Sequence, residues 1–336
     1  MNDGPKSLKV GLIGCGWVSQ HHLRAWRGCP DAEVVVLVDP SPEARDRRGD
    51  EFGIAHRFGS MQELIDSGLV DAVDIATPRE THADIVRAAA RAGLPVLCQK
   101  PLAPTLPEAE ALVKEVATLT RLMVHENWRF RPYIRDMARL VANGDIGAVK
   151  QCRLTLFHSG FIADGEGRLP AVVRQPFFAS LERMLVMEVL IHHIDALRFI
   201  FGKLNLKAAH WGHTVDGVRG DDFATITLEG SGPYGPSISI MANMAAHGYP
   251  NRVPDELVVL GDKGTLILSD NELRTFGEGS DSKISYDPDA VYRASYSGAI
   301  GHFVSALREG GPFETSPEDN LETLRLVEAI YQNGVR

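Results

Sequence analysis

Continuous apolar runs alternate with amphipathic segments over the first 127 residues. The run "AEVVVLVD" at 32–39 is rich in β-branched residues, which is typical of a strand buried on both faces. Similar runs predict strands at 9–14, 71–77, 95–100 and 121–127. The segments between them predict helices, one with Ser41 as its N-cap and Pro42 at its first position. This alternation predicts a parallel sheet with right-handed crossovers, whose ligand lies at the carboxyl ends of the strands.

The pattern changes after about Trp128. Strand-like runs follow one another without intervening helices, at 150–159, 221–230, 237–247, 255–262 and 264–270. They predict a mostly antiparallel sheet with a helix packed beside it. A last helix is predicted within 316–334, where Ser316 and Asp319 resemble a capping box. We therefore expect an α/β protein of two domains, 1–127 with the parallel sheet and 128–336 with the open, mostly antiparallel sheet.

Composition and charge narrow the possible partners. The chain has 35 basic and 44 acidic residues and a net charge of −9, which argues against a nucleic-acid partner. No stretch approaches the roughly 18 apolar residues of a membrane helix, and the start lacks a signal-peptide pattern. The four cysteines, Cys15, Cys29, Cys98 and Cys152, are scattered, which predicts a reducing, cytoplasmic location and neither a zinc site nor a disulfide framework.

A glycine-rich turn connects the first predicted strand to its helix. In "GLIGCGWVS", Gly14, Gly16 and Ser19 form a G-x-G-x-x-small pattern, with Cys15, Trp17 and Val18 between them. Glycines there permit a tight turn and the close approach of the backbone to a pyrophosphate, whose charge lies at the helix N-terminus. The five residues 14–18 are therefore expected to contact a dinucleotide.

Asp39 ends the second predicted strand, 20 residues beyond Ser19. A carboxylate there accepts hydrogen bonds from the adenosine ribose hydroxyls and repels a 2′-phosphate. Arg45, Arg47 and Arg48 follow, but they lie inside the next predicted helix. The sequence thus favours NAD over NADP.

The apolar segment "VMEVLIHHIDALRFI" at 186–200 contains four polar groups that are costly to bury. Along an α-helix, Glu188, His192 and Asp195 fall on one stripe, and His193 lies about 100° round from His192. The group is either a catalytic site or a hydrogen-bonded core network. The angle between the two histidines disfavours a metal site built from them and Glu188, and we expect no metal.

In order and spacing, "GLIGCGWVSQHH", "ATPRETH", "CQKPLA", "HENWRF" and "LIHHIDALRF" resemble the Gfo/Idh/MocA family of sugar and polyol oxidoreductases. The likeness covers nearly the whole chain. It implies a Rossmann domain followed by an α/β domain that binds substrate and whose open sheet often forms the oligomer interface. A homodimer or homotetramer is expected.

The resemblance also implies residue roles. Lys100 matches the catalytic lysine, His192 the histidine of a D-x-x-x-H motif, and Glu188 occupies the aspartate position. Thr77, Pro78 and His82 match the loop along the cofactor, and Asn127 matches a residue near the nicotinamide. Gln99 departs from the family, which usually has glutamate there; an amide still bonds a ribose hydroxyl but gives Lys100 no electrostatic help.

A dehydrogenase removes a hydride and a proton from one carbon–oxygen unit. We expect His192 to accept the hydroxyl proton, Glu188 to orient it, and Lys100 to stabilise the charge on the same oxygen. The reverse assignment, with Lys100 as proton acceptor, stays open. Lys100 precedes Pro101, so a cis peptide bond is conceivable. Asp195 either binds a substrate hydroxyl or holds the helix.

Trp128 and Arg129 are candidates for the substrate pocket, with interdomain packing as the alternative. The aperiodic segment 158–180 is expected to form the substrate wall, where Arg174 and Gln175 meet hydroxyls or a carboxylate and Phe177 and Phe178 close the pocket. Simple solvent exposure explains Arg174 equally well.

The sequence thus predicts an NAD-dependent dehydrogenase that converts an aldose to a lactone or a secondary alcohol to a ketone. The sequence pattern between Arg174 and Asp195 looks similar to that of bacterial aldose dehydrogenases, which gives D-apiose or another short aldose as the predicted substrate. The alternatives are a member that retains its cofactor for glycoside cleavage or epimerisation, and a dinucleotide-binding regulatory protein.

Overall fold

The computed structural model describes residues 7–231, 235–251, 254–277 and 281–335, which form two compact units. The first unit consists of the chain up to Phe130 together with Tyr292–Leu324. The second consists of Arg131–Val291 and the residues from Arg325 onward. The chain leaves the first unit near the boundary predicted after residue 127, but a later segment, Tyr292–Leu324, also belongs to that unit.

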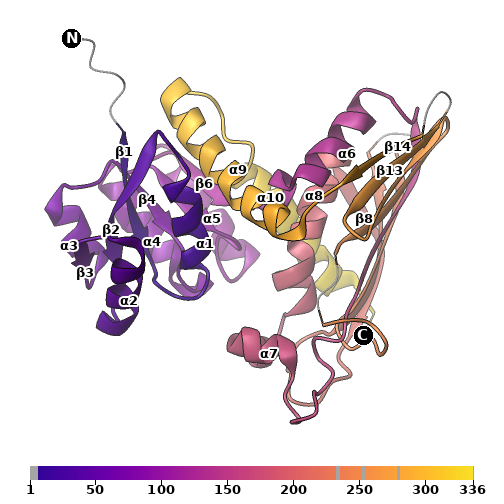
Figure 1. Ribbon diagram of the computed structural model, residues 1–336, viewed down its shortest axis with the longest axis horizontal. Coiled ribbons are helices and arrows are strands. Elements are labelled where there is room, and N and C mark those ends of the chain that lie inside the picture. Colours follow the sequence, from indigo (N-terminus) through magenta and orange to yellow (C-terminus); the bar gives the residue numbers. More distant parts are fainter. Residues whose placement is uncertain (1–6, 232–234, 252–253, 278–280, 336) are drawn as a thin grey trace. The chain divides into compact units, whose positions relative to one another are not determined.

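The first unit contains a six-stranded parallel sheet in the order β3-β2-β1-β4-β5-β6, with helices on both of its faces (Figure 1). Its strands are β1 (Leu8–Ile13), β2 (Ala32–Val38), β3 (His56–Phe58), β4 (Ala72–Ile75), β5 (Val96–Gln99) and β6 (Leu122–His125). Its helices are α1 (Ser19–Arg27), α2 (Pro42–Phe52), α3 (Met61–Ser67), α4 (His82–Arg91) and α5 (Leu106–Val116), with short 3₁₀ turns η1 (Arg79–Thr81) and η2 (Trp128–Phe130). The strand order reverses between β1 and β4, which is where a doubly wound sheet binds its ligand.

Burial on both faces explains why these strands lack polar alternation. Every residue of β4, β5 and β6 is buried. On one face, Trp26 of α1 packs in the same core as Phe303 of α9 (Pro288–Glu309). On the other, α3 lies so close that a Cβ at Gly11 would come within 2.4 Å of a Leu64 methyl group. The segment Tyr292–Leu324 belongs to this unit because it completes that core.

Local capping agrees with the sequence. Ser41 Oγ accepts a hydrogen bond from the Ala44 N–H, with Pro42 at the first position of α2. Ser316 Oγ accepts from the Asp319 N–H at the start of α10 (Pro317–Asn333). Both predicted helix starts are confirmed.

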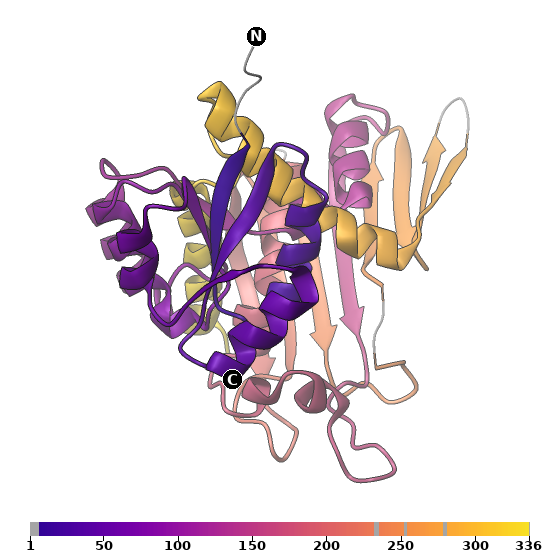
Figure 2. The same ribbon diagram turned by 60° about the vertical axis from the view of Figure 1, so that its left-hand side comes forward.

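The second unit contains an eight-stranded sheet in the order β14-β13-β12-β11-β7-β10-β9-β8, seen as a broad layer in Figure 2. Among the strands described for this sheet, only β7 and β10 pair in parallel with one another. The strands are β7 (Val149–Phe157), β8 (Leu204–Gly212), β9 (Phe223–Gly230), β10 (Ser237–Asn243), β11 (Glu256–Gly261), β12 (Gly264–Ser269), β13 (Glu272–Gly277) and β14 (Ser282–Ser285). The helical segments are α6 (Pro132–Ala142), α7 (Pro170–Arg174), η3 (Pro176–Ala179), η4 (Leu185–Leu190) and α8 (Ile191–Phe201).

The predicted fold class is confirmed: a parallel sheet is followed by a mostly antiparallel one. The sequence did not predict β3, β8, β13 or β14. In β8 a bulge between Leu206 and Ala208 breaks the two-residue alternation that identifies a strand. Among the described residues, no helix is long and apolar enough to cross a bilayer.

Candidate functional site

The turn after β1 has the geometry expected of a pyrophosphate cradle. Gly14 has a φ of +96°, and a Cβ there would lie 2.7 Å from the Ala76 carbonyl oxygen, so only glycine fits. A Cβ at Gly16 would meet nothing within 4 Å, so the backbone at this position is open to an approaching ligand. Helix α1 begins after Val18 without a side-chain cap, which leaves its first N–H groups available to an anion.

Asp39 links the carboxyl ends of the neighbouring strands β1 and β2. Its Oδ2 accepts from the Cys15 N–H at 2.7 Å and its Oδ1 from the Ser41 N–H at 2.8 Å. Each carboxylate oxygen keeps a second lone pair, so the predicted ribose contact remains chemically available. Sequence reasoning assigned this residue only to the cofactor; its structural part in the turn has no signature in the sequence.

The arginines of α2 reach back to the same turn. Arg45 donates to the Asp39 carbonyl at 2.9 Å. Arg48 donates to Ser19 Oγ at 3.1 Å and to the Gly16 carbonyl at 3.3 Å. These bonds from α2 to neutral oxygens stabilise the glycine turn and the end of β2, while the Asp39 carboxylate is the acidic group at the end of β2.

His82 connects the loop after β4 to the segment after β5. Its Nδ1 lies 2.9 Å from the Pro101 carbonyl oxygen and its Nε2 lies 2.9 Å from the Thr77 carbonyl oxygen. The side chain is buried, so it holds the Thr77–Pro78 loop from within. The Lys100–Pro101 peptide bond is cis. Contact of Thr77, Pro78 and His82 with the cofactor stays a prediction.

Lys100 directly follows β5, at the carboxyl edge of the parallel sheet. Its backbone N–H donates to Oε1 of Gln99 at 3.0 Å. The amide nitrogen of Gln99 lies 3.0 Å from His22 Nε2 and 3.2 Å from His125 Nδ1. Gln99 is therefore engaged mainly inside the protein, with one lone pair of Oε1 left for a ribose hydroxyl.

The segment after β6 is also engaged internally. Asn127 Nδ2 donates to Ser295 Oγ at 2.8 Å. The Trp128 N–H donates to a buried carboxylate, Glu126, at 3.2 Å. Sequence reasoning did not single out Glu126.

Arg129 is buried and bonded within the first unit. It donates to the Glu314 carbonyl at 2.9 Å and to Asp319 Oδ2 at 2.5 Å. These bonds tie the η2 turn to the start of α10. Its predicted contact with substrate stays a prediction, and its observed contacts are structural.

In the second unit, Glu188 lies on η4, which is a π-helix, and His192 lies on the α-helix that follows. The sequence predicted a single regular α-helix through both. A π-helical turn contains more residues than an α-helical one, so the stripe counted from α-helical angles does not hold across this junction. Such turns occur frequently at functional sites.

Buried Asp221 holds the start of this helical segment. It accepts from the Met184 N–H at 2.9 Å, the Val186 N–H at 2.8 Å and the Tyr331 hydroxyl at 2.9 Å. Burial raises the pKa of Asp221, and these hydrogen bonds only partly offset that rise. The anchor lies close before Glu188, and it fixes where the π-turn begins.

His193 is directed into a separate polar cluster. Its Nε2 lies 3.0 Å from Asp255 Oδ1, and Asp255 Oδ2 also accepts from Arg131 at 2.6 Å and from Tyr133 at 2.5 Å. Burial raises the pKa of Asp255, but the charges of Arg131 and His193 outweigh it and hold that pKa well below its usual range. His193 and His192 therefore have different environments. Across the ranges that the structure describes, no group of three histidine, cysteine or acidic residues is placed to hold a metal ion.

The predicted substrate wall contains a histidine that sequence reasoning did not single out. His158 follows β7, and its Nδ1 accepts from the Gly160 N–H at 3.0 Å. Burial and the charge of Arg174 lower the pKa of His158 to about 4. The His158 ring is therefore neutral near pH 7, with its hydrogen on Nε2 as a donor, and it lies close to Arg174, a predicted substrate-binding residue.

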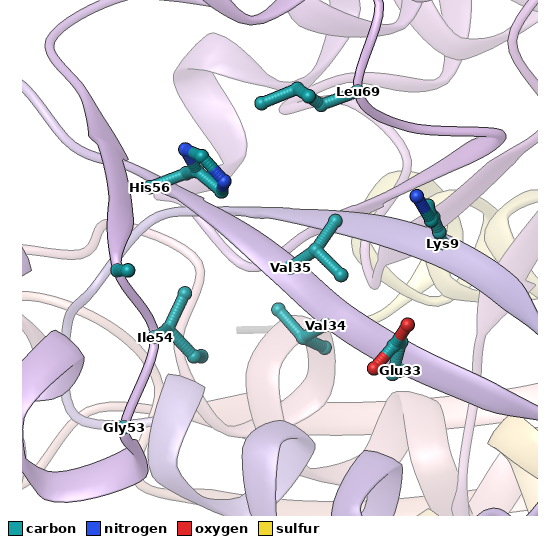
Figure 3. Close-up of a pocket in the computed structure, with 9 residues that line it drawn as sticks. Lys9, Glu33, Val34, Val35, Gly53, Ile54, His56 and Leu69 are labelled. Atoms are coloured by element: carbon teal, nitrogen blue, oxygen red, sulfur yellow. The ribbon is translucent and has the colours of Figure 1, made fainter.

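Figure 3 shows a hollow of about 290 Å³ in the first unit, lined by Lys9, Glu33, His56 and Leu69 among others. These residues lie at the amino ends of the parallel strands or in the connections leading into them. Gly14, Asp39 and Lys100 lie at the opposite edge. The hollow is therefore not where a dinucleotide is expected.

The predicted catalytic residues belong to both units. Lys100 lies in the first, and Glu188 and His192 lie in the second. Their joint action on one hydroxyl group stays a prediction.

Comparisons with known proteins agree with both halves of the chain. Residues 8–126 match the oxidoreductase family GFO_IDH_MocA, NAD-binding Rossmann fold, and residues 134–267 match the GFO/IDH/MocA C-terminal domain. A D-apiose dehydrogenase of Paraburkholderia graminis is 35% identical over 97% of this chain and 87% of that protein. A D-apiose dehydrogenase of Rhizobium rhizogenes is 32% identical over 97% of this chain and 95% of that protein.

Among solved structures, an oxidoreductase from Agrobacterium radiobacter in complex with NAD⁺, L-tartaric acid and magnesium has a TM-score of 0.89 at 30% identity, covering 98% of this chain and 96% of that one. A levoglucosan dehydrogenase has a TM-score of 0.84 at 22% identity, covering 98% and 97%, and shares the fold. The predicted NAD-binding domain is confirmed. The chain belongs to the Gfo/Idh/MocA family of oxidoreductases.

Proposed function

We propose that this chain is an NAD-dependent dehydrogenase of a short aldose, with D-apiose as its first candidate substrate. The supporting observation is its similarity to the two D-apiose dehydrogenases, each of which covers 97% of this chain. Within that span the chain contains the glycine turn, Lys100 after β5 and His192 on α8.

The proposed chemistry divides between the cofactor and the protein. NAD, when bound, accepts the hydride. Lys100 stabilises negative charge on the substrate oxygen, because an ammonium group favours an oxyanion. His192 accepts the hydroxyl proton, and Glu188, on the preceding helical turn, orients its ring.

NAD is proposed to bind along the carboxyl edge of the parallel sheet. Gly14–Val18 and the open start of α1 receive the pyrophosphate, and Asp39 receives the adenosine ribose. The same carboxylate disfavours the additional phosphate of NADP. Thr77, Pro78, His82, Gln99 and Asn127 complete the proposed cofactor site.

The test is NADH formation, measured by absorbance, with D-apiose, other aldoses, myo-inositol, levoglucosan and L-tartrate, each with NAD and with NADP. We expect the highest kcat/KM for a short aldose with NAD. Cleavage or epimerisation of a sugar without net NADH would support the cofactor-retaining alternative. NAD binding without turnover of any compound would support a regulatory protein. His192→Gln is the matched variant, expected to bind NAD normally and to lose turnover.

For the assembly, we propose a homodimer or homotetramer formed through the open sheet of the second unit. Met241, Leu260 and Phe276 are 43%, 38% and 39% exposed and lie on one face of that sheet by strand pairing. Light scattering after size exclusion tests this: the double variant Met241→Glu, Leu260→Glu should lower the mass to that of a monomer, and an unchanged mass contradicts the proposed interface.

A cytoplasmic location is proposed from the four free cysteines. Fractionation of cells that carry the tagged protein tests it, and recovery of the protein in the periplasm would contradict it.

A further inference from the structure

A chain of hydrogen bonds crosses the interior of the first unit and ends one residue before Lys100. It links Asp74 of β4, His22 of α1, Gln99 of β5 and His125 of β6, all of them buried. Asp74 Oδ2 lies 2.8 Å from His22 Nδ1, and His22 Nε2 lies 3.0 Å from Gln99 Nε2. Gln99 Nε2 lies 3.2 Å from His125 Nδ1. Hydrogen-bonded side-chain networks of this kind rigidify a core and fix the orientation of their members.

The bonds fix the orientation of the Gln99 amide. Its oxygen must be the atom that accepts the Lys100 N–H at 3.0 Å, so the atom facing the two rings is the NH₂ group. An NH₂ group only donates. Both His22 Nε2 and His125 Nδ1 must therefore present lone pairs to it.

This assigns a proton to each ring. His22 carries its hydrogen on Nδ1 and donates it to Asp74, which also accepts from Trp26 Nε1 at 2.7 Å. His125 carries its hydrogen on Nε2. The donors then have one consistent direction along the path from Lys100 through Gln99 and His22 to Asp74. Asp74 is the acidic member of the network and lies on the far side of His22 from Gln99.

We propose that Gln99 is a positioning residue that holds these two rings as neutral acceptors and so fixes the end of β5 beside Lys100 without placing a charge there. The inference rests on the proposed function for Lys100. An uncharged neighbour leaves the proton affinity of an amine lower than a carboxylate would, which suits a lysine that exchanges protons or binds an alkoxide.

Two titratable side chains packed around this network, His21 and Cys98, do not place a charge beside Gln99. The His21 ring, next to His22 on α1, has its pKa lowered to about 4 by burial and by Arg24. Burial and Asp74 raise the pKa of the Cys98 thiol well above its usual value. The Tyr296 ring of α9 lies 5.4 Å from the ring of His22 and 5.2 Å from that of His125. Near neutral pH the His21 ring and the Cys98 thiol are uncharged. The nearby acidic groups are Asp74, beyond His22, and the buried Glu126, which follows His125, whereas residue 99 itself accepts the Lys100 N–H.

The decisive variant is Gln99→Glu, which keeps the size of the side chain and replaces the donor by an anion. We expect the basic limb of the kcat/KM–pH profile, which in the proposed function depends on the protonated amine of Lys100, to move to higher pH by about one unit, a tenfold change in proton affinity. Gln99→Met is the matched control: it removes the same hydrogen bonds without adding charge, so it should lower activity and leave that limb in place. If Gln99→Glu only lowers activity, with its basic limb unmoved, Gln99 is structural and the proposal fails.

A second measurement does not depend on turnover. Neutron diffraction from crystals of the perdeuterated wild-type protein with NAD bound should show deuterium on His22 Nδ1 and His125 Nε2. Deuterium on His22 Nε2 or on His125 Nδ1 overturns the assignment. If no sugar is oxidised but the deuterium positions are as expected, the proposed function fails while the hydrogen-bond assignment stands.

Discussion

Three glycine-to-alanine substitutions, two in the dinucleotide turn and one control at the end of α2, distinguish effects on protein stability from effects on NAD binding. At Gly14 the added Cβ meets a backbone oxygen at 2.7 Å in a left-handed conformation. We expect a loss of about 2–5 kcal/mol in the free energy of unfolding, roughly 1–2 from the backbone and 1–3 from overpacking. At Gly53, with φ +70° and no atom within 4 Å, only the backbone cost of about 1–2 kcal/mol applies. At Gly16 neither cost applies, and stability should change by less than about 0.5 kcal/mol.

Binding should follow a different order. The methyl group of Gly16→Ala enters the open space where the pyrophosphate is proposed to lie, so the Kd for NAD should rise at least about tenfold, or 1.4 kcal/mol. Gly53→Ala, at the far end of α2, should leave the Kd unchanged. Urea unfolding and NAD titration by protein fluorescence measure the two effects. A folded Gly16→Ala protein that binds NAD within twofold of wild type would refute the placement of the pyrophosphate at this turn.

Three further outcomes are expected. Lys100→Met should lower kcat by at least about 100-fold with little change in the Kd for NAD, and normal turnover would show that Lys100 has no catalytic role. Asp255→Asn should lower the free energy of unfolding at pH 7 by about 3–5 kcal/mol, because Arg131 stays buried without the Asp255 carboxylate. Since folding lowers the pKa of Asp255, the difference in unfolding free energy between variant and wild type should shrink only below about pH 4 in acid unfolding curves. His158 titrates at about 4 when folded against 6.5 for an ordinary histidine, so acidification across that window should remove up to about 3 kcal/mol of stability, and His158→Gln should abolish that dependence. An unchanged slope in the His158 variant would show that another group titrates there.

The pattern of apolar and polar residues was sufficient to predict the strands whose two faces are both covered. The apolar runs of β1, β2, β4, β5 and β6 stand out because these strands are largely covered, whereas the short, partly exposed edge strand β3 was missed. Ser41 and Ser316 act through neighbours three residues away. The edge strand β8 and the π-turn at 185–190 were missed for a common reason. Each contains a local change in residues per repeat, and a regular template cannot detect it.

The candidate site divides in the same way. Gly14 and Lys100 could be placed from the sequence because each lies at the end of a strand, and strand ends in a parallel sheet share one edge. The internal engagement of Gln99 and Arg129 could not be predicted. Their partners lie up to 190 residues away in the chain, as in the bond from Arg129 to Asp319, and only the folded structure brings them together.

The return of Tyr292–Leu324 to the first unit affects how the protein is made. During synthesis the parallel sheet emerges from the ribosome first, but Phe303 and Phe313, which pack in the same core as Trp26, are translated well after Phe130. Until then the apolar side chains that they cover are exposed to solvent and to chaperones. A fragment that stops at Phe130 should therefore aggregate when expressed alone.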